Sequence, residues 1–140
     1  MREKSCGTVT FTRVDGQIKY LLTKTEYGVY GFAKGHVEQG ESERQTAVRE
    51  TWEETSVKPK IVNGFRKTIQ YKLKNGNDKT VVFFLGYFEN QTPRHNEGFE
   101  DMSYELVSYD EAMKLLTFDN TKRILKRANE FLTKQKEKKS

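Results

Sequence analysis

Three glutamates are expected to crowd one face of a single helix, and this arrangement limits what the chain can fold into. Glu50 stands three residues before Glu53 and four before Glu54, so their carboxylates project from the same side of a helix. Each exposed pair of like charges at this spacing costs about 0.2 to 0.5 kcal/mol. A hard divalent cation that takes oxygen ligands, Mg²⁺ or Mn²⁺, would offset the repulsion. The alternative is an acidic helix face that water solvates.

The beginning of this helix is marked in the sequence. Ser42 and Gln45 form the pattern of a capping box, which predicts a helix from about residue 43 to residue 55. A helix with carboxylates on one face is expected to bury the other. The side chains expected to face the sheet are Ala47, Val48, Thr51 and Trp52.

The rest of the sequence alternates extended segments with turns and ends in helical patterns. Asp15-Gly16 and the stretch 75–78 predict two hairpin turns. The expected strands are residues 8–13, 18–23, 30–33, 60–74 with a break at Gly64, 80–88 and 104–108. An exposed loop is expected over 90–102, a short helix over 109–116 and a final helix from 119 or 120. This mixture predicts an α/β fold in which helices pack on both faces of a mixed sheet.

Length and composition set the expected organisation. The chain has 140 residues and 34% hydrophobic content, which predicts a single domain over residues 1–140, and we expect a monomer. Cys6 is the only cysteine, so no intramolecular disulfide forms. This favours a reducing compartment, with the cytoplasm expected and the nucleus as an alternative. No apolar run approaches the length of a signal or a membrane span, so no membrane association is expected.

The positive charge is concentrated at the C-terminal end. The net charge of the chain is +5, of which residues 121–140 carry +6 and the rest carries −1. A basic end from about residue 133 is expected to be solvated and frayed. Binding of nucleic acid through this end is the less favoured alternative.

The segment from Gly35 to Val57 resembles the Nudix box of diphosphate-cleaving hydrolases. The matching positions are Gly35, Glu41, Arg49, Glu50, Glu53, Glu54 and Val57. The resemblance implies a Nudix-type α/β/α sandwich and hydrolysis of a diphosphate. Thr51 replaces an aliphatic residue of the pattern, and its hydroxyl is expected to bond the carbonyl four residues earlier. Ser56 replaces a glycine, at a cost of about 1 kcal/mol if the left-handed backbone is kept, so a slightly altered exit from the helix is expected.

The resemblance also implies a role for each position of the box. Glu50, Glu53 and Glu54 would hold one to three divalent ions, with the Gly35 carbonyl as a further ligand. Glu41 and Arg49 would fix the loop against the helix through a bidentate pair. Nudix enzymes often use one more glutamate from outside the box, as a metal ligand or general base. Glu100 is the predicted residue here, and Glu97 is the competitor.

Outside the box, further matching features are Cys6-Gly7, residues 34–38, Gly64-Phe65, Tyr71, residues 79–81, Ala112 and Phe118. In these the chain is similar to the animal-type asymmetrical bis(5′-nucleosyl)-tetraphosphatases. This resemblance implies asymmetrical cleavage of diadenosine tetraphosphate to ATP and AMP. Tyr71 and Phe118 are the predicted base-stacking residues, and the predicted phosphate contacts are Lys34, His36 and Lys79. The segment 30–33 lacks the prolines that the subgroup tends to have before Lys34, which makes the loop less rigid.

Two alternatives to this substrate stay open. The first is the same chemistry on another diphosphate, such as a diphosphoinositol polyphosphate, a nucleotide sugar, a nucleoside triphosphate or an RNA cap. The second is a non-catalytic module that binds a nucleotide or RNA.

Overall fold

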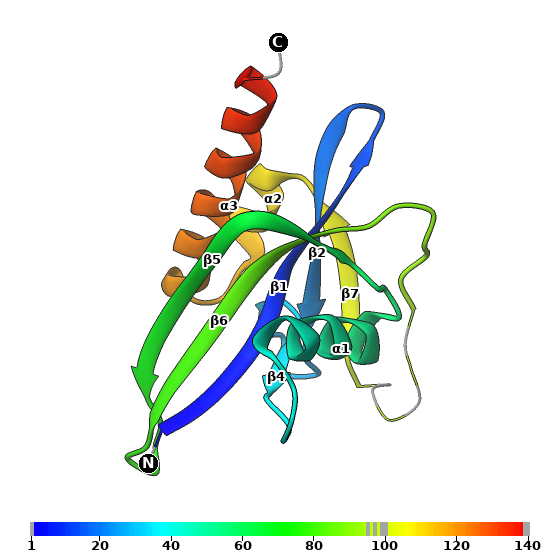
Figure 1. The fold of residues 1–140 in the computed structure, drawn as a ribbon. Helices are drawn as coiled ribbons and strands as arrows, with labels where there is room; N and C mark the ends of the chain where they lie inside the picture. Colours follow the sequence, from blue (N-terminus) through cyan, green and yellow to red (C-terminus); the bar gives the residue numbers. More distant parts are fainter. Residues whose placement is uncertain (1, 95, 97, 99–100, 139–140) are drawn as a thin grey trace.

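A seven-stranded mixed sheet forms the centre of the protein, as seen in a computed structural model that describes residues 2–94, 96, 98 and 101–138 (Figure 1). The strand order is β3-β2-β1-β6-β5, with β4 paired to β1 and β7 paired to β2. The strands are β1 (Arg2–Val14), β2 (Gln17–Lys24), β3 (Tyr30–Gly31), β4 (Lys34–His36), β5 (Lys60–Lys72), β6 (Asp78–Tyr87) and β7 (Ser103–Val107). The helices are α1 (Glu43–Thr55), α2 (Tyr109–Leu115) and α3 (Asp119–Lys138).

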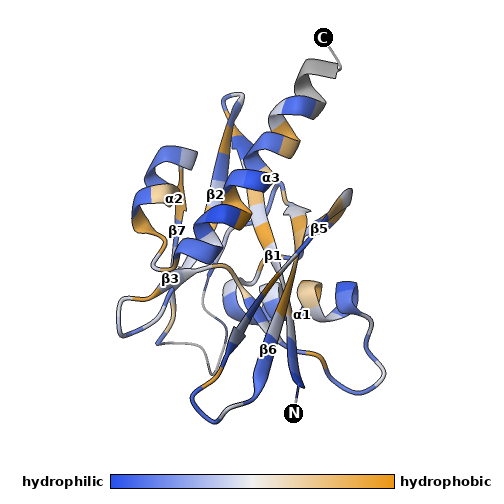
Figure 2. Cartoon of the chain, turned by 90° about the vertical axis from the view of Figure 1, so that its left-hand side faces the viewer, coloured by the Kyte–Doolittle hydropathy of each residue, from blue (hydrophilic) through white to orange (hydrophobic). Residues whose placement is uncertain are grey.

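The helices lie on both faces of the sheet, which confirms the predicted layer arrangement. Helix α1 packs mainly on β1 and β4, whereas α2 contacts β2 and α3 contacts β5 (Figure 1). The main core lies on the side of α2 and α3, and hydrophobic colouring runs along the central strands there (Figure 2). A smaller core on the α1 side contains Cys6, Ala47, Val82 and Phe84. Among the described residues, no helix combines the length and the apolar character that a membrane crossing needs.

Strand β1 is longer than predicted because its second partner is distant in sequence. Asp15 and Gly16 both have positive φ, 51° and 79°, as the predicted hairpin turn with β2 requires. On its other side, β1 runs parallel to β6 in a register that begins with Arg2 opposite Asp78. Local alternation in the sequence marks only the hairpin portion. The parallel pairing, which has no local signal, extends the strand back to Arg2.

The predicted start of α1 is confirmed, but two residues of its predicted buried face, Val48 and Trp52, are not among its buried positions. Ser42 accepts a hydrogen bond from the Gln45 amide, and the Gln45 side chain accepts one from the Ser42 amide. Trp52 is 49% exposed rather than packed on the sheet. The buried positions of the helix are Thr46, Ala47, Thr51 and Thr55. Small side chains let the helix lie close to β1, and the bulky Trp52 falls outside that narrow stripe.

The exit from α1 keeps the geometry that a glycine would give. Ser56 adopts the left-handed conformation, with φ 60° and ψ 19°, and its amide bonds the Trp52 carbonyl. Its hydroxyl donates to Asn96 Oδ1 at 2.6 Å, and Asn96 Nδ2 donates to the carbonyls of Trp52 and Glu53. These bonds offset part of the cost of a left-handed serine. The altered exit that the sequence predicted is therefore not found.

Candidate active site

Arg49 is the centre of the hydrogen-bond network in the loop and helix of the box. Its Nε and one terminal nitrogen donate to the two oxygens of Glu41, at 2.7 and 3.0 Å. Its other terminal nitrogen donates to Glu50 at 2.9 Å and to Glu53 at 3.1 Å. The His36 carbonyl accepts a further bond at 3.0 Å. The bidentate bond from Arg49 holds the pKa of Glu41 down at about 2, so this pair ties the loop to the helix at any ordinary pH.

Gly35 lies directly against the carboxylate of Glu50. A Cβ built on Gly35 would come within 2.0 Å of Glu50 Cδ and 2.2 Å of both carboxylate oxygens. No side chain can occupy that space, so glycine is required for close approach rather than for backbone angle. Strand β4 reaches this place because Gly35 pairs with Cys6 on β1.

Glu50 and Glu54 are carboxyl groups in a poorly solvated place. Burial, followed by the nearby charge of Glu50, raises the pKa of Glu54 to about 8, against the bond that its Oε2 accepts from the Lys34 amide at 2.9 Å. Burial also raises the pKa of Glu50, although Arg49 opposes this shift. The two carboxylates are therefore close, partly desolvated and incompletely neutralised, which is the electrostatic situation that a bound cation relieves.

The oxygen donors around Gly35 fit a hard divalent cation. The Glu50 carboxylate lies next to the backbone of Gly35, that of Glu54 bonds the Lys34 amide, and that of Glu53 shares the Arg49 guanidinium with Glu50. Such oxygen ligands suit Mg²⁺ or Mn²⁺. Across the described part of the chain, however, no three acidic, histidine or cysteine side chains stand ready around one ion position. Arg49 bridges Glu50 and Glu53 instead. A cation that uses both carboxylates must replace those two bonds. Glu100, the predicted ligand from outside the box, and its competitor Glu97 lie outside the described residues.

A cavity of about 560 Å³ opens beside Glu54 and brings four predicted site residues together. Lys34 and Glu54 line one part of it, and Tyr71 and Phe118 contribute aromatic surface. Phe118 is 55% exposed and Tyr71 is 37% exposed, so their rings are available to a ligand. The volume is typical of small-molecule sites. Aromatic walls beside one cationic side chain, Lys34, and a carboxylate suit a molecule that combines a base with phosphates.

Lys79 and His36 lie together beside this cavity rather than in its wall. Lys79 is opposite Tyr71 in the pairing of β5 and β6 and is only 5% exposed. Its Nζ donates to Ser5 Oγ and lies 3.1 Å from His36 Nε2. His36 Nε2 is also 3.3 Å from a Glu3 oxygen. Burial, and then the charge of Lys34, lower the pKa of Lys79, so an added anion would stabilise its charged form.

The sequence analysis missed several residues that line the cavity. Tyr30 and Met102 come from a short strand and from the end of the predicted loop, where periodicity gives no signal. Asn120 lies at the beginning of α3 and was predicted only as a possible first residue of that helix. The aromatic character of Tyr30 was the available signal, since large side chains of loops often line sites.

Comparisons with known proteins agree with this geometry. The NUDIX domain family matches residues 1–128 of the chain. An asymmetrical bis(5′-nucleosyl)-tetraphosphatase from Sus scrofa is 34% identical, with 94% of this chain and 97% of that protein covered. The protein of the same name from Rattus norvegicus is 31% identical at the same coverage. A crystal structure of a C. elegans Ap4A hydrolase binary complex superimposes with a TM-score of 0.84 at 26% identity, covering 94% of this chain and 98% of that one.

Proposed function

Because the chain belongs to the NUDIX family, we propose that it is a divalent-cation-dependent hydrolase that cleaves diadenosine tetraphosphate asymmetrically, into ATP and AMP. The observation that carries the proposal is the cavity in which Tyr71 and Phe118 stand near Glu54. It offers aromatic surface for an adenine next to the acidic helix. Relatives named asymmetrical bis(5′-nucleosyl)-tetraphosphatase, similar to this chain over 94% of its length, support the choice of substrate.

The aromatic side chains and the cations of the site have separate tasks in this proposal. Tyr71 and Phe118 stack on a base, which contributes about 1 to 3 kcal/mol per base. Lys34 and Lys79 neutralise phosphate oxygens, and His36, next to Lys79, donates a hydrogen bond to the same chain of phosphates. The substrate is thereby held with its phosphate chain running from the cavity toward α1.

The acidic side chains supply the conditions for attack by water. Glu50, Glu53 and Glu54, with the Gly35 carbonyl, would hold the cation, for which we propose Mg²⁺. A divalent cation at such a site lowers the pKa of a water and neutralises phosphate charge. We propose Glu100 as the additional ligand or base. Glu41 and Arg49 act as positioning residues, because the Arg49 guanidinium holds the loop and helix in register.

The setting of the reaction follows from the same features. The substrate is a small nucleotide, and we propose that the protein acts as a monomer, as one catalytic domain. Cys6 is buried, and a lone buried thiol is compatible with a reducing compartment. We therefore propose the cytoplasm as its location.

The test is a panel of diphosphates incubated with protein and Mg²⁺, with the products identified by chromatography. ATP and AMP in equal amounts from diadenosine tetraphosphate are expected. Orthophosphate from a diphosphoinositol polyphosphate would instead favour the other substrate class. Absence of turnover of every compound, with either Mg²⁺ or Mn²⁺, would exclude the proposed chemistry.

A pair of variants connects the activity to the site. Glu54→Gln should lower kcat by about 10² to 10⁴-fold, the range for removing a group that acts in the transition state. Glu130→Gln removes the same charge from an exposed position of α3 and should leave kcat unchanged. Equal rates for Glu54→Gln and the unmodified protein would contradict the assignment.

A further inference from the structure

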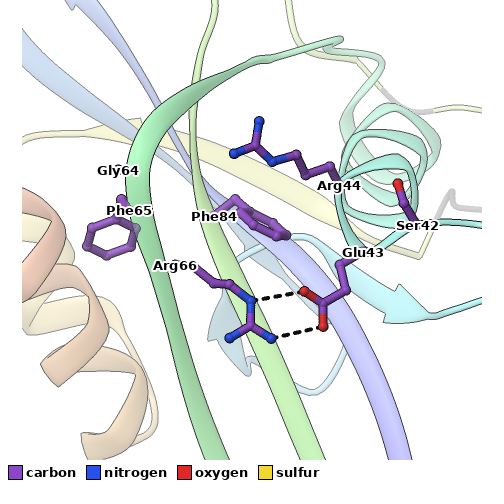
Figure 3. A pocket seen from close by; sticks show the side chains of 7 residues that line it. All are labelled: Ser42, Glu43, Arg44, Gly64, Phe65, Arg66 and Phe84. Atoms are coloured by element: carbon purple, nitrogen blue, oxygen red, sulfur yellow. Dashed lines mark hydrogen bonds and ion pairs between the residues drawn. The ribbon is translucent and has the colours of Figure 1, made fainter.

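A second cavity, of about 500 Å³, lies between the beginning of α1 and β5. It is on the opposite face of the sheet from Tyr71, because Arg66 is paired with Phe84, which packs toward α1. Figure 3 shows the side chains that line it: Ser42, Glu43, Arg44, Gly64, Phe65, Arg66 and Phe84. This cavity is therefore separate from the candidate active site.

An irregularity of β5 creates this space. The pairing of β5 with β6 shifts between Val62 and Arg66, and Gly64 has a positive φ of 97°. A bulge of this kind bends a strand and re-aims the side chains beside it. Such bulges occur frequently next to functional sites. Here the bulge places Arg66 across the cavity from Arg44 (Figure 3).

Positive charge exceeds negative charge around the cavity. Arg66 donates from Nε and one terminal nitrogen to the two oxygens of Glu43, at 2.9 Å each. Lys4 binds the same carboxylate. These bonds hold the pKa of Glu43 at about 2, so the carboxylate stays charged. Among the lining residues, Arg44 and Arg66 against Glu43 leave a net charge of +1 (Figure 3). Lys4, which binds Glu43, brings the local net charge to +2.

Arg44 is held in a geometry that leaves donors available. Its guanidinium lies over the Phe84 ring, 5.7 Å from the centroid, and one terminal nitrogen donates to Asn63 Oδ1 at 3.1 Å. Stacking on an aromatic ring fixes a guanidinium without using its donors. A guanidinium has five N–H groups, so one bond to Asn63 leaves most of them for a ligand.

We propose that this cavity binds the phosphate group of a small anionic ligand. A phosphate group carries about −1.5 to −2 charges at neutral pH, which balances the excess of +2 at the cavity. The planar fork of Arg44 matches the spacing of phosphate oxygens, and Arg66, whose Nε and one terminal nitrogen bond Glu43, adds positive charge and its remaining N–H groups. The volume of about 500 Å³ exceeds that of a phosphate alone and falls within the range of small-molecule sites. The ligand would bridge β5 and the first turn of the helix that carries the catalytic glutamates.

Binding of inorganic phosphate and of AMP to the full-length protein in EDTA tests the proposal. Without divalent cations no hydrolysis takes place, so the outcome is independent of the proposed activity. Isothermal titration calorimetry should show one saturable site for phosphate, and amide chemical shifts should place it at residues 42–44 and 63–66. The Kd should rise about tenfold or more in Arg44→Ala and in Arg66→Ala. Arg44→Lys, which keeps the charge without the fork, should give an intermediate Kd.

Lys67→Ala is the matched control. Lys67 is adjacent to Arg66 but pairs with Phe83, which belongs to the core on the α3 side. Its removal takes the same charge from the opposite face of β5, and the Kd should stay within about twofold. Tighter binding of AMP than of phosphate, with the same dependence on the arginines, would support a ligand with a nucleoside. Absence of saturable phosphate binding, unchanged affinity in both arginine variants, or an equal loss in Lys67→Ala would overturn the proposal.

Discussion

A chain of buried hydroxyl groups connects α1 to the central strand β1. Its contribution to the free energy of unfolding can be measured. Thr51 Oγ1 donates to the Ala47 carbonyl at 2.8 Å, as the sequence predicted, and lies 2.8 Å from Thr8 Oγ1. Thr8 Oγ1 is also 2.6 Å from Thr10 Oγ1. Thr51 and Thr8 are fully buried. The contact between helix and sheet at this place is therefore made by hydrogen bonds inside the protein rather than by aliphatic packing.

Replacing Thr51 by Val should destabilise the protein only modestly. Valine has nearly the shape of threonine, so the change creates no cavity. Thr8 keeps Thr10 as a partner, and the Ala47 carbonyl keeps its helical bond, so no buried polar group is left unpaired. The cost is then that of the lost hydrogen bonds, about 0.5 to 1.5 kcal/mol each before the gain from burying a methyl group. We expect a net loss of about 1 kcal/mol, or about 4 °C in Tm.

The double variant Thr8→Val/Thr51→Val separates the shared bond from the others. Each single change removes the bond between the two hydroxyls, but the double change removes it once. Urea unfolding should therefore show the double variant losing less free energy than the sum of the singles, by about 1 kcal/mol. Thr68→Val, at an exposed position of β5, is the control and should not couple to Thr51. Strict additivity of the Thr8 and Thr51 changes would refute the assigned bond.

Three further predictions concern the candidate active site. In Gly35→Ala the new Cβ lies 2.0 Å from Glu50 Cδ, whereas ordinary contact begins at 3.4 Å. The carboxylate must therefore move about 1.4 Å, and kcat should fall about 100-fold. An unchanged kcat in folded protein would contradict this. Phe118→Ala should raise KM about 5- to 100-fold with a smaller effect on kcat, whereas Tyr27→Ala, an exposed aromatic outside the cavity, should leave KM unchanged. Burial raises the pKa of Glu54 to about 8 in the folded state, so protein in EDTA should lose stability as the pH rises from about 4.5 to 8. Tm measured across that range should fall, and Glu54→Gln should flatten the profile.

Local signals in the sequence predicted the elements that depend on local chemistry. The capping box at Ser42, the hairpin turn at Asp15-Gly16 and the break of the long strand at Gly64 each involve residues within a few positions of one another. Backbone angle and side-chain capping determine these features, so composition over a short window is sufficient. The left-handed exit at Ser56 was not predicted, because the bonds that Asn96 makes to this turn come from a residue 40 positions away.

The features that the sequence did not predict depend on contacts between distant segments. Val48 and Trp52 were expected on the buried face because they are apolar, yet Thr46 and Thr55 are buried there instead. Hydropathy ranks threonine too low to reveal an interface that hydrogen bonds stabilise. The contact of Gly35 with Glu50 joins β4 to α1. The distance between the two residues along the chain does not indicate that they touch in the folded protein. The resemblance to the Nudix box identified Gly35 and Glu50 as site residues but did not indicate that their contact requires a glycine.

The place of β1 in the middle of the sheet has a consequence for how the protein is made. Cys6 pairs with Val82, 76 positions later in the chain. During synthesis on the ribosome, the edge of β1 that pairs with β6 therefore stays unpaired until β6 has been synthesised. At about 5 to 20 residues per second, this delay lasts about 4 to 15 s. Throughout that interval the exposed strand edge is available to other nascent chains and to chaperones, so yield in the cell depends on synthesis rate as well as on the stability of the finished fold.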